Sequence, residues 1–158
     1  MTESPKIEQY KQLIVQVQAL IDPECSWLAN YANVIAAIQS TFHHWWCGFY
    51  FVNQRQELEL GPFQGPVACT LIGFNQGVCG SSWARKETIL VPDVHQFEGH
   101  IACSSESNSE IVVPVIQNNH VIGVLDIDSV NFGEFDEIDQ HYLELIVELL
   151  PEMHPVHV

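Results

Sequence analysis

The sequence is poor in basic residues. Only five of its 158 residues are Lys or Arg, against 20 Asp and Glu, so the formal net charge is −15. Nucleic acids and anionic membrane surfaces select basic proteins, and this balance argues against both as partners. The sequence also lacks an N-terminal basic segment followed by an apolar one, and no apolar run is long enough to cross a bilayer. We therefore expect no membrane contact and a cytoplasmic location.

Cysteine spacings typical of metal sites or secreted scaffolds are also missing. The five cysteines, at positions 25, 47, 69, 79 and 103, are an odd number and form no Cys-x-x-Cys motif. This pattern argues against a disulfide-rich secreted domain and against a zinc ribbon. What is present is a large hydrophobic fraction, 47%. That fraction is enough for a core, and we expect one domain spanning residues 1–158.

Amphipathic helical patterns lie at both ends of the chain. Apolar residues recur at helical spacing over residues 7–20 and again over about residues 26–42. A third helix is predicted between Asp136, which has the chemistry of an N-cap, and Pro151, which halts it. Helices are therefore expected to flank whatever structure the middle of the chain forms.

Short aromatic and β-branched runs fill the middle of the chain. The segments "WCGFYFV", "LELGPF", "VACTLI" and "TILVPDV" are typical of strands, and "FNQGVCGSSWARK" is predicted to be a short inserted helix. The clearest hairpin is "EIVVPVIQNNHVIGVLDID", where Asn118 and Asn119 tolerate the positive φ of a tight turn. Hairpin-linked strands between helices predict the α+β class, with an antiparallel central sheet flanked by N- and C-terminal helices.

Three of the five cysteines lie in glycine-rich segments. These are Cys69 in "GPFQGPVAC", Cys79 in "NQGVCG" and Cys103 in "GHIAC". A single free cysteine is more often a small core residue, which is how we interpret Cys25 and Cys47. Three cysteines in such contexts instead favour redox chemistry. Cys103 is the least like a core residue, because Gly, Ser and Asn surround it in sequence.

Three carboxylates and two aromatic residues of the predicted strands are further candidates for a site. Asp126 and Asp128 are two apart in a strand, so both project from one face, and Glu110 opens the paired strand of the same hairpin. Such a cluster can hold a proton at neutral pH and can bind an ammonium group; the alternative is a solvated strand end. Trp46 and Tyr50 also share a face, either as core residues or as the wall of a small-molecule pocket.

Taken together, these segments resemble the free methionine-(R)-sulfoxide reductases, enzymes built on a single GAF domain. The matching segments are "WCGFYF", "LGPFQGPVAC", "GVCG", "DVHQFEGHIAC", "SNSEIVVP" and "GVLDIDS", which cover about residues 46–130. Generic GAF domains lack this cysteine set, so the resemblance is specific. The sequence departs from the family at Gln76, where many members have a basic residue, and at Trp83, where a smaller residue is common.

The resemblance implies a role for each matched residue. Cys103 would attack the sulfur of free methionine (R)-sulfoxide, Cys69 would resolve the sulfenic acid as a disulfide, and Cys79 would be an alternative partner. Glu110, Asp126 and Asp128 would bind the substrate and assist proton transfer, while Trp46 and Tyr50 would surround its methyl group. The resemblance also implies regeneration by thioredoxin and NADPH, no metal or organic cofactor, a role in oxidative stress, and the homodimer that family members often form.

Two other functions stay open at this point. One is a GAF sensor module that binds a small molecule without turnover; such modules usually belong to longer chains with an output domain. The other is a metal protein using Cys69, Cys79, Cys103 and His100, which no close ligand pair supports. His95 and His100 lie near Cys103 in sequence, but their spacing does not identify either as the base that activates it.

Overall fold

One antiparallel sheet organises the structure. The computed structural model describes residues 4–101, 103 and 105–154. Its six strands lie in the order β3-β2-β1-β6-β5-β4. In chain order they are β1 (Trp46–Val52), β2 (Glu57–Gln64), β3 (Leu71–Gly73), β4 (Ile89–Val91), β5 (Ser109–Gln117) and β6 (His120–Ser129). The α+β prediction is confirmed.

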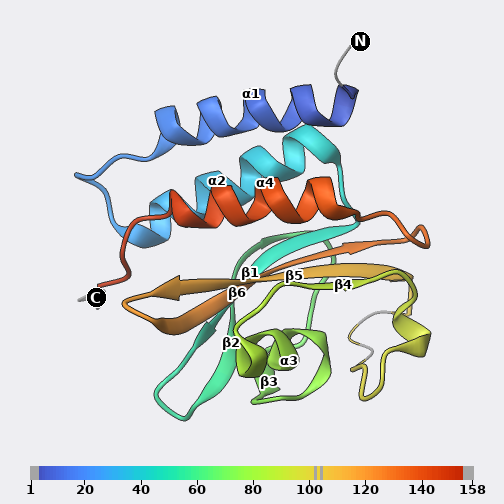
Figure 1. Ribbon diagram of the computed structural model, residues 1–158. Helices are drawn as coiled ribbons and strands as arrows, with labels where there is room; N and C mark the ends of the chain where they lie inside the picture. The colour runs from blue at the N-terminus through green and yellow to red at the C-terminus, as the bar shows by residue number, and fades with distance from the viewer. Residues whose placement is uncertain (1–3, 102, 104, 155–158) are drawn as a thin grey trace.

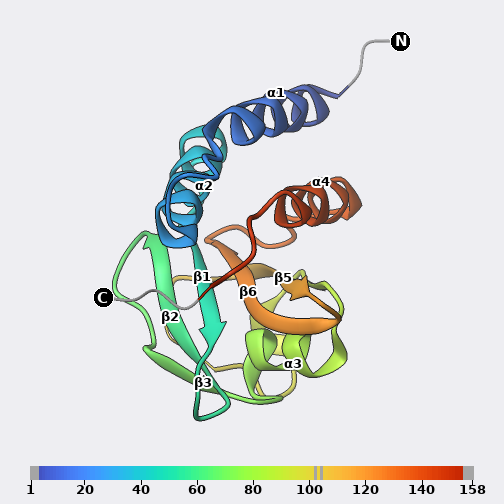
Figure 2. The same cartoon turned by 90° about the vertical axis from the view of Figure 1, so that its left-hand side faces the viewer.

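Helices cover both faces of the sheet, and they do so unequally. The helices are α1 (Pro5–Leu20), α2 (Trp27–Phe42), α3 (Gly77–Arg85) and α4 (Glu137–Glu148), with a short 3₁₀ helix η1 (Val94–Gln96). Figures 1 and 2 show α2 and α4 on one face with α1 packed over them, and α3 alone on the other. In the described part of the chain, no helix has the length and apolar character needed to cross a bilayer.

Local sequence chemistry explains most element boundaries. The Ser26 side chain accepts a hydrogen bond from the Ala29 amide and caps α2, and Asp136 forms a capping box with Asp139 at the start of α4. Asn118 and Asn119 adopt φ values of 50° and 64° in the turn between β5 and β6. The predicted helices, hairpin and inserted helix α3 are therefore confirmed.

The strand predicted for "VACTLI" is largely wrong. Only its last two residues belong to β3, and residues 67–70 form no strand. The backbone leaves the sheet at Gly65, which has a φ of 137°, and the Pro66 and Cys69 carbonyls accept hydrogen bonds from aromatic side chains rather than from a neighbouring strand. Because these carbonyls are satisfied, the segment can cross one face of the sheet as an irregular loop.

The strand register separates the face covered by α2 and α4 from the face that carries the predicted acids. On the face toward α2 and α4, alternate residues of the central strands, such as Phe49, Leu125 and Ile111, are completely buried. On the opposite face, Trp46 lies across from Asp128 in the β1–β6 ladder, and Glu110 lies across from Asp128 in the β5–β6 ladder. The three predicted acids therefore share a face, and that face points away from the main helical core.

A buried polar contact fastens α1 to the start of α4. The Tyr10 hydroxyl donates to Asp139 Oδ1 at 2.7 Å, and Lys6 Nζ lies 2.5 Å from Asp139 Oδ2. Tyr10 and Asp139 are almost completely buried. Because a buried carboxylate must be paired to be tolerated, this contact fixes how the N-terminal helix docks.

We expect Tyr10→Phe to lower the free energy of unfolding by about 1–2 kcal/mol, because it leaves a buried carboxylate oxygen short of a hydrogen bond. Urea unfolding followed by circular dichroism measures the change. Tyr142→Phe is the matched control, since Tyr142 stacks on Tyr10 with ring centroids 5.1 Å apart and no hydrogen bond of its hydroxyl is recorded among the described residues. An equal loss in both variants would contradict this role for the Tyr10 hydroxyl.

Candidate active site

A pocket opens on the face of the sheet that carries Glu110, Asp126 and Asp128. It lies between β1, β5 and β6, the first turn of α3, the loop after β2 and the loop before β5. Its lining includes all the predicted site residues except Cys69: Trp46, Tyr50, Cys79, Cys103, Glu110, Asp126 and Asp128. In the described part of the chain, no Lys or Arg lines it.

The three carboxylates form a cluster on adjacent strands, in which Glu110 and Asp126 are buried and Asp128 is half-buried. Glu110 and Asp126 are 5% and 6% exposed. Asp128 accepts a hydrogen bond of 2.6 Å from the Ser107 hydroxyl, whereas Asp126 Oδ1 is buried without a hydrogen-bond partner among the described residues. The predicted convergence of the three acids is thus observed.

Burial raises the pKa of every acid in the cluster, and repulsion from neighbouring carboxylates adds to this for Glu110 and Asp128. Burial, reinforced by the charges of Asp126 and Asp128, raises the pKa of Glu110 well above its usual range. Burial raises the pKa of Asp126 to about 6. Burial and the charge of Asp126 raise the pKa of Asp128 well above its ordinary value. The cluster therefore retains at least one proton at neutral pH and can donate it.

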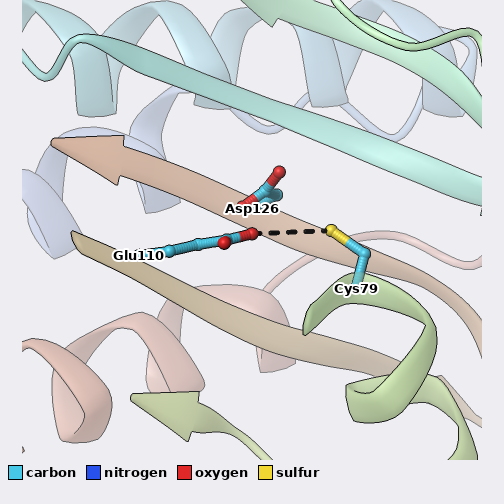
Figure 3. A group of neighbouring side chains, drawn as sticks. All are labelled: Cys79, Glu110 and Asp126. Carbon is cyan, nitrogen blue, oxygen red and sulfur yellow. Dashed lines mark hydrogen bonds between the residues drawn. The ribbon is translucent and has the colours of Figure 1, made fainter. Parts of the chain in front are cut away.

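Cys79 adjoins this cluster from the first turn of α3. Its Sγ lies 4.0 Å from Glu110 Oε1, with Asp126 beside them (Figure 3). Burial first, and then the charges of Asp126 and Glu110, raise the pKa of the Cys79 thiol well above its ordinary value. Cys79 is therefore a neutral thiol at physiological pH, which makes it a poor nucleophile.

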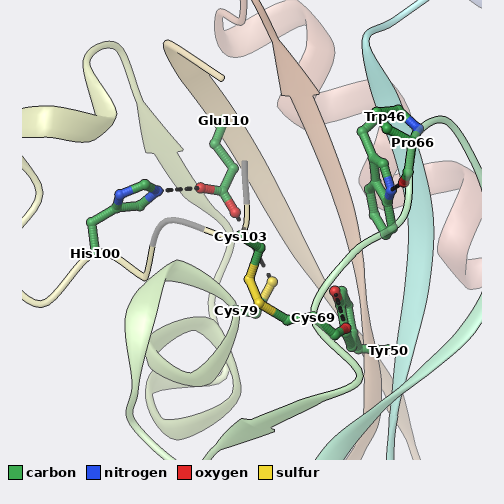
Figure 4. The surroundings of a disulfide bond; sticks show 8 residues. All are labelled: Trp46, Tyr50, Pro66, Cys69, Cys79, His100, Cys103 and Glu110. Atoms are coloured by element: carbon green, nitrogen blue, oxygen red, sulfur yellow. Dashed lines mark hydrogen bonds and ion pairs between the residues drawn. A yellow bond between two sulfur atoms is a disulfide. The ribbon is translucent and has the colours of Figure 1, made fainter. Parts of the chain in front are cut away.

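A disulfide joins Cys69 to Cys103 at the edge of the pocket (Figure 4). The two Cα atoms are 5.5 Å apart, although 34 positions separate the residues in sequence. Cys69 comes from the loop that leaves the sheet at Gly65, and Cys103 from the segment before β5. Of the remaining cysteines, Cys79 and Cys47 are buried. Cys25 is exposed in the turn before α2, so its interpretation as a core residue is wrong, whereas that of Cys47 is confirmed.

Trp46 and Tyr50 act both as core residues and as a pocket wall. Their ring centroids lie 5.9 Å apart, and Trp46 also stacks on Phe63 at 5.4 Å. Trp46 Nε1 donates to the Pro66 carbonyl and Tyr50 Oη donates to the Cys69 carbonyl. Glycine is needed at position 48, because a Cβ there would lie 2.4 Å from the Trp46 ring. These two aromatic residues therefore hold the Cys69 loop over the pocket.

His100 is a pocket residue that its sequence context does not identify as functional. Its Nε2 lies 3.9 Å from Glu110 Oε2, and burial, followed by the charge of His95, lowers the pKa of His100. The imidazole is therefore mostly neutral beside a protonated acid. His95 instead lies outside the pocket, where its Nδ1 is 2.9 Å from Asp93 Oδ1. Only a spatial arrangement distinguishes these two histidines.

The two departures from the family pattern lie in different places. Gln76 lines the pocket at the N-terminus of α3, where its side chain makes no capping hydrogen bond. Trp83 lies further along α3 and packs edge-on against Phe74, with ring centroids 4.8 Å apart. Only Gln76 is therefore placed to contact a ligand in this pocket.

The structure does not assemble the cysteine and histidine metal set considered from sequence. The sulfur atoms of Cys69 and Cys103 are bonded to each other, so neither is available as a thiolate ligand. The described residues instead bring together Cys79, Glu110 and Asp126, whose potential ligand atoms all lie within 4.8 Å of one another.

Comparison with known proteins links this site to a family. The model of the GAF domain family matches residues 31–150. The GAF domain-containing protein A of Dictyostelium discoideum is 49% identical over 150 residues, which are 95% of either chain. The free methionine-R-sulfoxide reductase of Escherichia coli is 45% identical over 146 residues, covering 91% of this chain and 88% of its own.

A solved structure agrees with these sequence matches. The free methionine-R-sulfoxide reductase of Neisseria meningitidis, in complex with its substrate, superposes with a TM-score of 0.90 at 45% identity, covering 95% of this chain and 90% of that one. The similarity therefore extends over the flanking helices as well as the sheet.

The raised pKa values predict that the acid cluster lowers the free energy of unfolding as the pH rises. A folded-state pKa above the unfolded value means that the folded chain binds the extra proton, so stability falls between about pH 4 and the folded pKa. We expect Glu110→Gln to raise the free energy of unfolding at about pH 8 by roughly 1–3 kcal/mol, and by much less at about pH 4.5. Urea unfolding at the two pH values measures this difference.

Glu24→Gln is the control, because Glu24 is exposed in the turn before α2. It makes the same chemical change at an exposed carboxyl group, where there is no burial or repulsion to relieve. A Glu110→Gln variant that is less stable than the parent at the higher pH would show that the cluster is not held under electrostatic strain.

Proposed function

We propose that this chain, which belongs to the GAF domain family and to its group of free methionine-R-sulfoxide reductases, reduces free methionine (R)-sulfoxide to methionine. The observation that carries the proposal is the Cys69–Cys103 disulfide, which lies at the edge of a pocket lined by a proton-holding acid cluster and two aromatic residues. Sulfoxide reduction by this route needs a thiol to attack the sulfur, an acid to protonate the oxygen and an apolar surface for the methyl group.

The reaction proceeds in two covalent steps. In the reduced protein the sulfur of Cys103 attacks the sulfoxide sulfur, and the oxygen passes to Cys103, which leaves methionine and a cysteine sulfenic acid. The substrate sulfur gains the two electrons that Cys103 loses. Cys69 then attacks the sulfenic sulfur, so that the S–S bond forms and water leaves with the thiol proton. The Cys69–Cys103 disulfide in the structure is the bond that this second step would form, which supports the proposal.

The acid cluster supplies the proton that the sulfoxide oxygen must gain. Glu110, whose pKa burial raises, holds such a proton at neutral pH. His100 Nε2, 3.9 Å from Glu110 Oε2, is the nearby ring nitrogen that we propose returns a proton to Glu110. Cys79 is a neutral thiol that donates toward the cluster and is not required as a second resolving cysteine.

Complementary charges explain a preference for the free amino acid. Asp126 Oδ1, which is buried without a partner among the described residues, can accept a hydrogen bond from the substrate ammonium. Residues 76–79 at the N-terminus of α3 also line the pocket, where the helix dipole favours the substrate carboxylate. Trp46 and Tyr50 would pack against the methyl group. A methionine within a polypeptide has neither terminal charge.

Thioredoxin is the reductant that we propose for the disulfide, with NADPH as the source of electrons and no bound metal or organic cofactor. This assignment fits a cytoplasmic enzyme that repairs oxidised free methionine. Because the net charge of −15 gives no long-range attraction to an acidic partner, docking would depend on local contacts around the disulfide. A homodimer stays an expectation from the family.

Turnover of purified protein tests the proposal directly. We expect NADPH oxidation, coupled through thioredoxin and its reductase, with free methionine-R-sulfoxide and not with the S form or a peptide-bound sulfoxide. Cys103→Ser should abolish turnover. Cys69→Ser should allow one methionine per protein to form and then stall, because the sulfenic acid has no resolving partner. Cys25→Ser is the control. Failure to reduce any sulfoxide would favour the alternative, a GAF module that only binds its ligand.

The role of Asp126 can be isolated with a matched pair of substrates. We expect Asp126→Asn to raise the KM for free methionine-R-sulfoxide by roughly tenfold or more, because a charge-assisted hydrogen bond is lost. The same substitution should change little for N-acetyl-methionine-R-sulfoxide, which has no ammonium. Steady-state kinetics on both substrates measure the difference, and equal losses on the two would place Asp126 elsewhere in the reaction.

A further inference from the structure

The acid cluster and Cys79 together make a set of ligand atoms. Cys79 comes from α3, Glu110 from β5 and Asp126 from β6, and one potential ligand atom of each lies within 4.8 Å of the other two (Figure 3). All three side chains are buried, and all three line the pocket rather than the helical core. They are therefore shielded from bulk water yet reachable by a small ligand.

An unsatisfied oxygen points to a positively charged ligand at this position. Asp126 is 6% exposed, and its Oδ1 has no hydrogen-bond partner among the described residues. In the described part of the chain, no Lys or Arg lines the pocket to balance Glu110, Asp126 and Asp128. A buried carboxylate oxygen without a partner is costly, so a cation that supplies its missing partner would bind favourably.

The donor atoms select the class of cation. One sulfur and two carboxylate oxygens do not make the all-oxygen shell that Ca²⁺ and Mg²⁺ prefer. They do suit a borderline-soft divalent ion such as Zn²⁺, which takes thiolate and carboxylate ligands in a four-coordinate site and accepts water in a remaining position.

We propose that Cys79, Glu110 and Asp126 form a site for Zn²⁺ or a similar divalent cation, and that the bound ion reversibly blocks the pocket. Binding replaces the proton of the Cys79 thiol and any proton held by the two carboxyl groups, and no atom changes oxidation state. The ion would occupy the position proposed above for the substrate ammonium, so the inference that it blocks the pocket rests on the proposed function. The inference that the ion binds does not depend on that function.

The proposed cation site contains neither of the disulfide cysteines. Cys69 and Cys103 are bonded to each other in the structure that brings the three ligands together. Cation binding should therefore survive with the disulfide intact. If a reduced Cys69–Cys103 dithiol captured the metal instead, binding would be lost when the disulfide is intact.

The experiment is a Co²⁺ titration of the full chain in its disulfide form, without added reductant. We expect one equivalent of Co²⁺ to bind with a near-ultraviolet thiolate-to-cobalt absorption band, and Zn²⁺ to displace it. Cys79→Ser should remove the band, whereas Cys25→Ser and Cys47→Ser should retain it. Glu110→Gln should keep the thiolate and weaken Co²⁺ affinity by at least roughly tenfold. Thermal unfolding of each metal-free variant checks that it is folded.

Each outcome decides between defined alternatives. Absence of the thiolate band, or its persistence in Cys79→Ser, overturns the site. Competition of free methionine sulfoxide with Co²⁺ supports the blocking role, and simultaneous binding without competition overturns that role. The band requires no catalysis, so a chain that reduces no sulfoxide but shows the Cys79-dependent band would refute the proposed function and leave the metal site standing.

Discussion

Burial of Glu110 and Asp126, with the half-buried Asp128 beside them on neighbouring strands, is the constraint on which the rest of this structure depends. Among the described residues that line the pocket there is no Lys or Arg to balance them. Such an arrangement is unfavourable by itself, because each charge loses its water and repels the others. It is tolerated because the opposite face of the same strands packs into a continuous apolar core beneath α2 and α4. The fold thus provides stability on one side of the sheet and reactivity on the other.

β1 connects the two sides. Phe49 is completely buried in the helical core, while Trp46 and Tyr50 extend from the other face and bond the carbonyls of the loop that carries Cys69. The position of that cysteine is therefore set by side chains of the central sheet rather than by its own irregular backbone. Gly48 lies between the two aromatic residues and leaves the space that the Trp46 ring occupies.

Sequence patterns predicted the features that depend on local chemistry and strand alternation. The alternation of "GVLDIDS" placed Asp126 and Asp128 on one face, and the Asn118–Asn119 turn fixed the hairpin that brings Glu110 to them. Patterns did not predict that residues 67–70 leave the sheet, because the hydrogen bonds that replace the ladder come from aromatic residues about 20 positions away. They also did not separate His100 from His95, since only the fold brings one of them to Glu110. Long-range contacts of this kind leave no trace in local periodicity.

The 34-position separation of Cys69 and Cys103 means that oxidation closes a covalent ring around β3, α3 and β4. Closing a ring of this length removes about 4 kcal/mol of conformational freedom from the unfolded chain. The proposed catalytic cycle therefore alternates between a cross-linked and an uncross-linked form of the chain. The segment that carries Cys79 and part of the pocket wall has its two ends cross-linked after each turnover and lacks that cross-link when the next substrate arrives. By thermodynamic reciprocity, the electron donor that reduces the disulfide must also supply the free energy by which the closed ring stabilises the folded chain.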